Sequence, residues 1–374
     1  MSLSLVKPDA EGRLQQFFED VGGHYKNSVG YPVAKDFDYR KLFPFLEMSL
    51  NNCGDPYSDV TYKVHSRTFE REVIDFVAEL FRGEKKDTWG YVTNGGTEGN
   101  LYGLYLARQT FPDAVCYYSK AAHYSIPKNV NILGIPGVAV GVDQHDELDY
   151  EDLFQKLDPT KPAIILASIG TTMREARDDI GIIQDQLKQK RITNFYIHCD
   201  AALDGMIAPF LDPRPKFDFA DGADSIAVSG HKFLGCPLPC GVVLCKKKAV
   251  EAVRTYVPYI DGYDETISGS RSGITPLFLW YAITKDGYTG LRQRVFNCLK
   301  TALYAKGRLE ALGVDVALKE GSITLVFPKP QSWVIDKWQL ATQGEVSHLL
   351  TVPGITVGLI DAFVADMERS LKNI

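Results

Sequence analysis

Short apolar runs alternate with amphipathic stretches through the middle of the chain. Strands are predicted where mostly apolar residues are bounded by polar or glycine positions, at Trp89–Thr93, Ala114–Tyr118, Ala163–Ile169, Asn194–His198, Ser225–Val228 and Gly241–Cys245. Helices are predicted where apolar residues recur every three or four positions, at Arg67–Phe81, Thr97–Phe111, Tyr150–Lys156 and Gly181–Gln189. This alternation predicts an α/β fold with a mostly parallel, doubly wound sheet.

The pattern changes toward both ends of the chain. Residues 1–55 are expected to form an N-terminal helical arm, and residues 56–288 a large domain that contains the sheet. After about Gly290, a long helical pattern precedes an alternating strand at Ser322 to Phe327, and a last helix follows. Residues 289–374 are therefore predicted to form a smaller C-terminal α+β domain.

Polar clusters follow five of the predicted strands. They are Asn94 to Thr97, Ser119 to Ser125, Thr171 with Thr172, Asp200, and Ser229 to Lys232. In doubly wound sheets, ligands bind beyond the carboxyl ends of the strands. We therefore expect the five clusters to converge on one edge of the sheet and to form the binding site.

Lys232 and Asp200 are the most informative members of these clusters. A lysine that leaves a strand end on small residues can attack a buried aldehyde, because burial helps its ammonium to lose a proton. An aspartate at the neighbouring strand end can keep a ring nitrogen protonated, with Ala202 beneath the ring. Together they suggest pyridoxal phosphate (PLP), bound as a lysine Schiff base. An exposed lysine and a helix-capping aspartate are the plain alternatives.

Other candidate residues have a functional and a structural interpretation. Gly95 and Gly96 join a strand to a helix, where backbone N–H groups can approach a phosphate, but a tight turn capped by Thr97 is equally consistent. His123 could stack on a pyridine ring and move protons, although a lone histidine is more often structural. Arg271, in Gly269-Ser270-Arg271, could bind a phosphate or carboxylate, or form a surface salt bridge.

Composition excludes several classes of function. The chain has 374 residues, 45% of them hydrophobic and 24% charged, and its net charge of -6 gives no footprint for nucleic acid. No apolar run approaches the ~20 residues that span a membrane, and the first residues lack a signal-peptide core, so a cytoplasmic location is expected. The cysteines and histidines lack metal-site spacing, so no metal is expected and the cysteines are expected to be reduced.

These motifs, in this order, resemble the group II PLP-dependent amino-acid decarboxylases, most of all the bacterial histidine decarboxylases, with the plant serine decarboxylases as close relatives. The resemblance runs from about Asn51 to Trp280. Two further motifs within this range, Asn51 to Asp55 and Cys236 to Gly241, contribute to it. It implies PLP fold type I, related to aspartate aminotransferase, with residues 56–288 binding PLP. It further implies a homodimer with active sites at the interface.

The resemblance also implies roles for individual residues. Lys232 would form the Schiff base, and His123 would stack on the ring and contact the substrate, which makes both catalytic. The other cofactor contacts would be Gly95, Gly96, Thr97, Thr171, Thr172, Asp200, Ala202, Ser229 and His231. Substrate contacts would be His123, Tyr57 and Ile274. His123, Tyr259 or Tyr263 would return a proton to the carbanion.

The implied reaction converts an L-amino acid to an amine and CO2, with histidine placed ahead of serine as the substrate. Cys53 favours the histidine enzymes, whereas Val64 to Arg67 and Leu277 to Tyr281 favour the serine enzymes. Both groups usually have histidine at the position of Ile274, and the loss of a polar contact can change selectivity strongly. Another PLP-dependent lyase or transferase, and a non-catalytic binding protein, are the alternatives.

Overall fold

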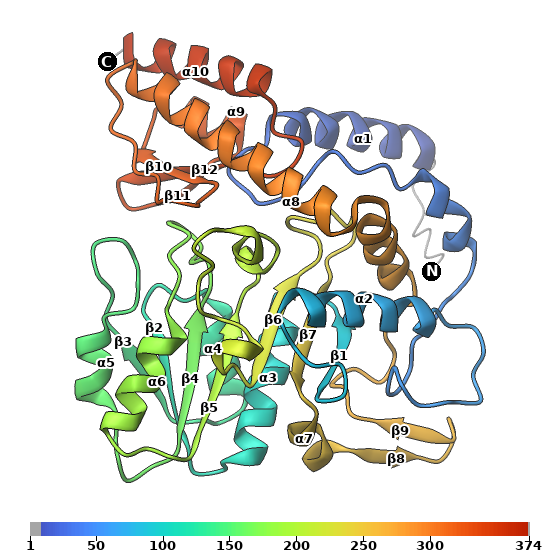
Figure 1. Ribbon diagram of the computed structural model, residues 1–374. Coiled ribbons are helices and arrows are strands. Elements are labelled where there is room, and N and C mark those ends of the chain that lie inside the picture. Colours follow the sequence, from blue (N-terminus) through green and yellow to red (C-terminus); the bar gives the residue numbers. More distant parts are fainter. Residues whose placement is uncertain (1–8, 373–374) are drawn as a thin grey trace, which may run out of the picture.

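A seven-stranded sheet forms the centre of the molecule in the computed structural model, which describes residues 9–372 (Figure 1). Its strands are β1 (Thr88–Thr93), β2 (Val115–Ser119), β3 (Gly137–Val140), β4 (Ala163–Ser168), β5 (Phe195–Asp200), β6 (Ser225–Ser229) and β7 (Gly241–Lys246). The spatial order is β1-β7-β6-β5-β4-β2-β3, and only β7 runs antiparallel to its neighbours. The mostly parallel sheet predicted from the sequence is confirmed.

Helices cover both faces of this sheet. The connecting helices are α2 (Arg67–Leu80), α3 (Gly96–Thr110), α4 (Ser125–Ile132), α5 (Tyr150–Lys156) and α6 (Ile180–Gln189). Because side chains alternate along a strand, Ile164 and Ile165 of β4 enter two different cores. The core with Ile164 includes α3 and α4, and the core with Ile165 includes α2, α5 and α6. A fully covered sheet explains why its strands are apolar throughout.

The C-terminal part forms a second, smaller α+β unit. It contains α9 (Ser332–Trp338), α10 (Val357–Lys372) and a three-stranded antiparallel sheet of β10 (Thr324–Pro328), β11 (Ala341–Gln343) and β12 (Val346–Leu350). The long helix α8 (Ile274–Glu310) leads into it and is interrupted at Gly287, where φ is 57° and ψ is -172°. The expected domain boundary after residue 288 lies next to this break, and its last residues, 373–374, lie outside the described chain.

The N-terminal arm contains α1 (Ala10–Asn27) and the 3-10 helix η1 (Arg40–Glu47); residues 1–8 of the expected arm lie outside the described chain. The segment after α1 runs along the small unit, where the Val29 N–H donates to the Trp338 carbonyl at 3.1 Å. It then reaches the large unit, where the Ala34 N–H donates to the Lys232 carbonyl at 3.0 Å. The arm therefore contacts both units, and its contact with the large unit lies just after the carboxyl end of β6.

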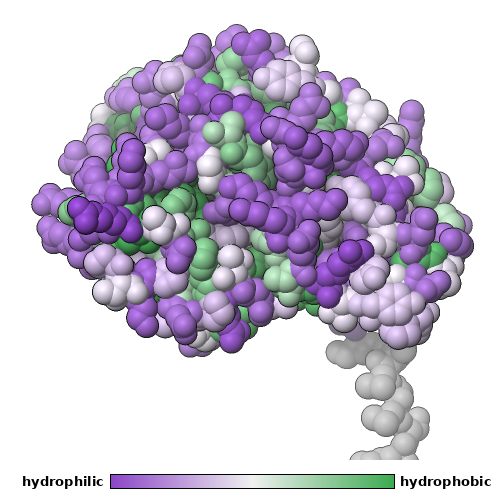
Figure 2. Space-filling model, turned by 60° about the horizontal axis from the view of Figure 1, so that its bottom comes forward, coloured by the Kyte–Doolittle hydropathy of each residue, from purple (hydrophilic) through white to green (hydrophobic). Residues whose placement is uncertain are grey.

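Short elements complete the fold. A hairpin of β8 (Thr255–Val257) and β9 (Gly262–Asp264) follows the short helix α7 (Lys247–Val250), and both lie at the bottom of Figure 1. Within residues 9–372, no helix is long and apolar enough to cross a membrane. The face shown in Figure 2 is largely hydrophilic, with hydrophobic patches between the polar side chains.

Candidate active site

The carboxyl ends of β5 and β6 bring Asp200 and Lys232 to the same edge of the sheet. Asp200 is the last residue of β5 and pairs with Ala227 of β6. The Ala201 N–H donates to the Ala227 carbonyl at 2.9 Å, and the Ser229 N–H donates to the Ala202 carbonyl at 3.2 Å. These bonds fix the two strand ends against each other, so Asp200 and the Ser229 to Lys232 segment occupy one site, as the sequence predicts.

A glycine turn between β1 and α3 forms a cradle beside this site. Gly95 has a φ of +141°, which favours glycine, and Thr93 Oγ1 donates to its carbonyl at 3.0 Å. A Cβ atom at Gly96 would lie 3.0 Å from Ser229 Oγ and 3.2 Å from the Ala202 Cβ. The first N–H groups of α3 therefore lie next to Ser229. The capping alternative for Thr97 is wrong, because Gly95 is the N-cap and no side chain caps this helix.

His123, Asp200 and Lys232 lie within electrostatic reach of one another. Burial lowers the pKa of Lys232, and the Asp200 and Asp204 carboxylates oppose that effect. Burial also lowers the pKa of His123, where Asp200 opposes the shift and Lys232 adds to it. His123 Nδ1 is 2.8 Å from Ser125 Oγ, so Nε2 is the ring nitrogen that remains for a ligand. The site thus combines a deprotonation-prone amine with a neutral imidazole and a carboxylate.

Three further predicted site residues, His231, Thr171 and Thr172, differ in how far they are exposed to solvent. His231 is half-buried, and its Nδ1 lies 2.8 Å from the Cys240 carbonyl, which orients the ring. Thr171 is buried, and its hydroxyl accepts from the Ala176 N–H at 3.0 Å, which shapes the turn after β4. Thr172 is exposed on that same turn.

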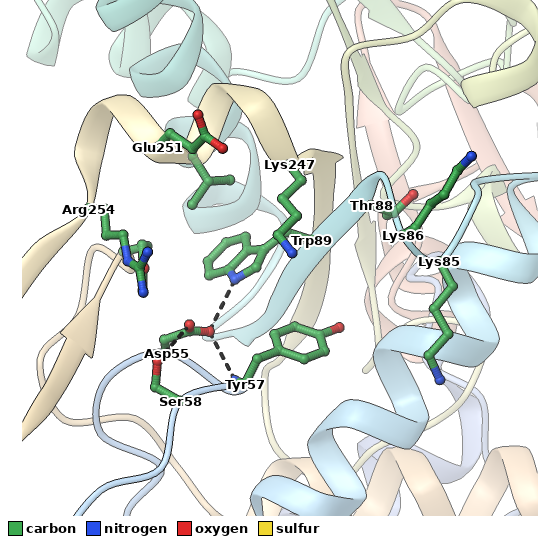
Figure 3. Close-up of a pocket in the computed structure, with 12 residues that line it drawn as sticks. Asp55, Tyr57, Ser58, Lys85, Lys86, Thr88, Trp89, Lys247, Glu251 and Arg254 are labelled. Atoms are coloured by element: carbon green, nitrogen blue, oxygen red, sulfur yellow. Dashed lines mark hydrogen bonds and ion pairs between the residues drawn. The ribbon is translucent and has the colours of Figure 1, made fainter.

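Tyr57 is not brought to this cluster within the single chain. It lines a separate pocket of about 440 Å³ with Thr88 and Trp89, where Asp55 Oδ1 accepts from Trp89 Nε1 at 3.1 Å (Figure 3). Thr88 is the first residue of β1, whereas the Gly95 turn follows its last residue. Ile274 is the half-buried first residue of α8, and its N–H donates to Ser272 Oγ at 3.2 Å.

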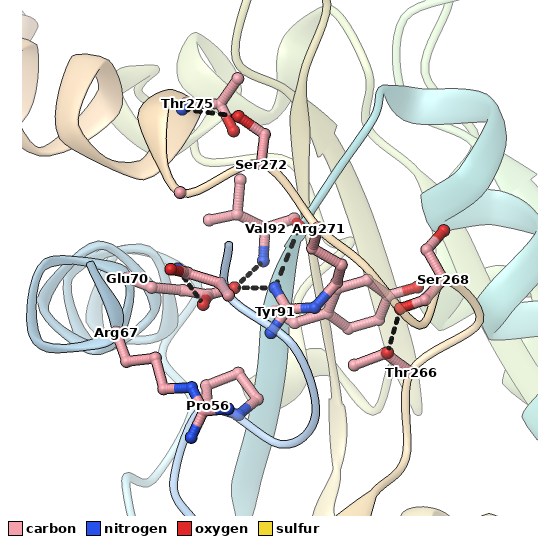
Figure 4. A network of polar contacts seen from close by, with 12 residues as sticks. Pro56, Arg67, Glu70, Tyr91, Val92, Thr266, Ser268, Arg271, Ser272 and Thr275 are labelled. Carbon is pink, nitrogen blue, oxygen red and sulfur yellow. Dashed lines mark hydrogen bonds and ion pairs between the residues drawn. The ribbon is translucent and has the colours of Figure 1, made fainter. Parts of the chain in front are cut away.

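Arg271 is buried, so the expected surface salt bridge is wrong. It forms a buried ion pair with Glu70 of α2 and donates to the Gly54 carbonyl at 2.9 Å (Figure 4). Glu70 also accepts from the Val92 N–H of β1 at 2.9 Å and from Asn52 Nδ2 at 2.7 Å. This network joins the N-terminal segment, α2 and β1, and it occupies both terminal nitrogens of the guanidinium, Nη1 and Nη2.

Sequence reasoning missed three buried charged residues beside the site. Arg177 pairs through Nε with Asp204, and its Nη2 lies 3.1 Å from Glu175 Oε1. All three are less than a tenth exposed. In the sequence, the charges from Arg174 to Asp179 are typical of a solvated loop. One signal was present in the sequence. Asp204 follows Asp200, the last residue of its strand, by only four residues.

Comparisons with known proteins agree with this geometry. The family described as "Pyridoxal-dependent decarboxylase conserved domain" matches residues 65–327. A histidine decarboxylase of Mesorhizobium japonicum is 46% identical, covering 98% of this chain and 99% of its own. A histidine decarboxylase of Pseudomonas fluorescens is 45% identical, covering 97% and 92%.

Solved structures show the same fold. The L-methionine decarboxylase of Streptomyces sp. 590 is 26% identical, with a TM-score of 0.91 over 97% of this chain and 95% of that chain. A glutamate decarboxylase of Lactobacillus brevis is 16% identical, with a TM-score of 0.81 over 100% and 94%. The predicted fold type is therefore confirmed.

The residues present fit PLP. The glycine cradle leaves room for a phosphate beside Ser229, because a Cβ at Gly96 would close the gap. Asp200 is buried and accepts a backbone bond from the Ala202 N–H at 3.2 Å, so its carboxylate suits a protonated ring nitrogen. A lysine of lowered pKa lies beside it. The chain belongs to the pyridoxal-dependent decarboxylase family, and is a PLP-dependent amino-acid decarboxylase of fold type I.

Proposed function

We propose that this protein decarboxylates L-histidine to histamine and CO2. The observation that carries the proposal is the identity of 45–46% to histidine decarboxylases over nearly the whole of both chains. Serine, giving ethanolamine, is the second candidate, because Val64 to Arg67 and Leu277 to Tyr281 resemble the serine enzymes. Ile274 departs from the histidine that both related groups usually have. An apolar side chain there would remove a hydrogen-bonding group from any substrate it contacts.

Lys232 and Asp200 have the central roles in this proposal. When bound, PLP supplies an electron sink for the electron pair that departing CO2 leaves behind. Lys232 Nζ attaches the cofactor, and its lowered pKa favours the neutral amine that this attachment needs. Asp200 holds a proton on the ring nitrogen. Ala202 would pack against the ring, because its Cβ lies beside the glycine cradle, 3.2 Å from where a Cβ at Gly96 would be.

The remaining site residues bind, orient and transfer protons. Gly95, Gly96 and Thr97 present N–H groups to the phosphate, with Ser229 beside them. His123 stacks on the ring and moves a proton through Nε2, because Nδ1 faces Ser125.

Four further contacts complete the proposed site. Thr171 or Thr172 would contact the phenolic oxygen of the cofactor, and His231 would add a ring or phosphate contact. Ile274 contacts the substrate side chain. Tyr57 lies beside the first residues of β1, at the end opposite the Gly95 turn, so its proposed contact would be with the site of a partner subunit.

We also propose a homodimer with active sites at the interface. Helix α1 supports this proposal, because none of its residues is buried in the single chain. Its apolar residues Leu14, Phe17, Phe18 and Val21 recur at helical spacing and are 45–73% exposed. A second copy of the chain would cover them. The seven free cysteines support the proposed cytoplasmic location.

The test is a screen of the twenty amino acids that measures amine product and CO2 from the purified enzyme. We expect histidine to give equal amounts of histamine and CO2, with kcat/KM at least about tenfold above the next substrate. Ile274→His is the matched variant, and we expect it to change the ratio of kcat/KM between histidine and serine. A preference for serine or for an aliphatic amino acid would reject the histidine assignment.

A further inference from the structure

The pocket beside Trp89 lies at the end of β1 opposite the Gly95 turn. Its volume of about 440 Å³ is in the range of pockets that bind small molecules. Its walls come from the turn at Asp55, the start of β1, the short helix α7, and the residues on either side of the β8–β9 hairpin, Arg254 and Glu265. None of the cofactor contacts proposed above lines it, so the pocket is separate from the cofactor site of its own chain.

The wall of this pocket contains two buried carboxylates but, within residues 9–372, only one cation that pairs with either of them. Glu265 Oε1 pairs with Arg254 Nε at 3.1 Å, and the Arg254 guanidinium also stacks on the Tyr263 ring at 3.7 Å. Asp55 accepts instead from a neutral donor, Trp89 Nε1, at 3.1 Å. Negative charge therefore exceeds positive charge in this part of the wall, which favours a ligand that brings a cation.

The carboxylate of Glu265 also lacks a hydrogen-bond donor. The residue is 4% exposed, and no group of residues 9–372 donates to its Oε2. The Tyr102 hydroxyl donates to the Glu265 carbonyl at 2.7 Å, which holds the residue in the wall. A buried carboxylate oxygen without a donor is costly. Because Glu265 lines the pocket, a ligand there can supply the missing donor.

The other cations of the pocket have different positions. Lys85 and Lys86 each pair with an acidic residue of their own, and Figure 3 shows both of them apart from Asp55. Lys247 begins α7 and lines the pocket, as does the apolar side chain of Val250 at the end of that helix. The pocket thus offers an acceptor for a protonated nitrogen, apolar surface, and a cation for a second, anionic group.

We propose that this pocket is a second binding site of the enzyme, for a small ligand that carries a protonated nitrogen. Glu265 Oε2 accepts a hydrogen bond from that nitrogen, and the charge of Asp55 adds to the attraction. Two molecules of an amino-acid decarboxylation have this chemistry, the amino acid and the amine product. An amino acid would also present its carboxylate to Lys247, whereas the amine has no carboxylate. The site does not depend on which amino acid is decarboxylated.

The titration of Glu265 gives the binding a pH dependence. Burial and the Asp55 carboxylate raise the pKa of Glu265 to about 7, and Arg254 opposes them. Because only the ionised carboxylate attracts a cation, the affinity should be full above about pH 7 and should fall as the pH drops below it. Among residues 9–372, the side chains that line this pocket include no histidine. The other titratable groups around Glu265 are Asp264 and, on the pocket walls, Tyr57, Lys85, Lys86, Lys247 and Glu251.

The experiment measures the binding of trimethylammonium to the holoenzyme without substrate, by saturation-transfer NMR of the methyl groups. A tertiary amine cannot form a Schiff base, so the ~420 nm band of the cofactor should stay unchanged. We expect a dissociation constant on the order of 1 mM for so small a ligand. Glu265→Gln should raise it at least about tenfold, because the amide has no charge. Glu147→Gln is the control, because Glu147 pairs with Lys319 at 2.7 Å outside the pocket, and it should leave the constant unchanged.

A second probe, N,N-dimethylglycine, distinguishes the two sources of the ligand. It carries a tertiary ammonium group and also a carboxylate. If it binds more tightly than trimethylammonium, and Lys247→Ala removes the difference, the site takes an amino acid. If trimethylammonium binds at least as tightly, the site takes an amine.

The proposal is overturned if neither probe shows saturable binding, or if Glu265→Gln binds trimethylammonium as tightly as the wild type. The pH profile of the wild type serves if that variant does not fold. Its dissociation constant should rise about tenfold for each pH unit below the pKa of Glu265, because the probe itself titrates near ~10 and keeps its charge. A flat profile between about pH 5 and about pH 8 would also overturn the proposal. Because no substrate is present, none of these outcomes depends on histidine being the substrate.

Discussion

Two buried aspartates at opposite ends of the strands of the large sheet, Asp218 and Asp200, have different partners. At the edge where β1 and β6 begin, the Asp218 side chain is fully buried, and it binds Arg82 at 2.8 Å and Arg214 at 2.5 Å. At the edge where β5 ends, Asp200 is buried as well but forms no ion pair within residues 9–372. It accepts instead from the Ala202 N–H at 3.2 Å.

This difference separates charge used for folding from charge held for chemistry. A buried carboxylate with its own cations is neutralised when the chain folds, and removing one partner mainly costs stability. A buried carboxylate whose cation must come from a ligand makes the folded protein depend on that ligand instead. Substitution of Asp218 should therefore reduce stability, and substitution of Asp200 should reduce cofactor binding and rate.

The largest effect is expected for Lys232→Ala. The amine that attaches the cofactor is lost, so kcat should fall on the order of 10⁴-fold or more and the ~420 nm band should disappear. The free energy of unfolding of the protein without cofactor should change little. Decarboxylation assays and absorbance spectra check this. Retention of more than about a hundredth of the wild-type rate would contradict the role of Lys232.

Asp200→Asn should have the next largest effect. The amide cannot stabilise a protonated ring nitrogen, so kcat should fall on the order of 10²- to 10³-fold while the lysine attachment persists. Rate measurements at saturating cofactor, together with the absorbance band, separate these two consequences. An unchanged kcat would show that Asp200 does not face the ring.

Asp218→Asn tests the buried carboxylate that pairs with two arginines at the opposite end of the strands. The Arg82 and Arg214 side chains are 41% and 23% exposed and can turn to water, so the loss should be about 2 kcal/mol of unfolding free energy. Urea unfolding measures it, and kcat per bound cofactor should be unchanged. Glu84→Gln is the control, since its pair with Lys86 is exposed to solvent and should leave the urea midpoint unchanged.

The effect that is smallest at neutral pH is the pH dependence of stability that His198 contributes. Burial lowers the pKa of this β5 residue to about 3, whereas the unfolded chain titrates near ~6.5. Between these values only the unfolded state binds the proton, so stability is complete above about pH 6.5 and falls as the pH drops. In His198→Gln, the free energy of unfolding, measured with urea at decreasing pH, should decline less steeply, by up to ~1.4 kcal/mol per pH unit. Parallel curves would contradict this.

The sequence was sufficient where local pattern and strand order carry the information. Apolar runs with polar ends located six strands, and the rule for carboxyl ends correctly placed Asp200 and Lys232 together. The strand β3 was missed because it has only four residues, begins with glycine and is partly exposed at the margin of the sheet. Such a segment has too few positions to show a period.

The buried ion pairs could not be predicted, because their partners are distant in the chain. Arg271 and Glu70 are 201 residues apart. Glu175 and Ser322 are 147 residues apart and meet only when the small unit packs on the large one. A charged residue at such a position looks the same in the sequence as one in a solvated loop. Tyr57 shows the converse, because the family resemblance implied a substrate contact for it, whereas in the single chain it lies away from the site.

The burial of every cysteine has a practical consequence. All seven thiols are free and buried, and burial raises the pKa of Cys116 and of Cys298 to about 12. Because a thiol reagent attacks the thiolate, it should modify these residues only when the chain around them opens. Cys116 lies in β2 and Cys298 in α8. The rates at which the two are labelled would report separately how often the sheet and the long helix open in the native protein, without any introduced probe.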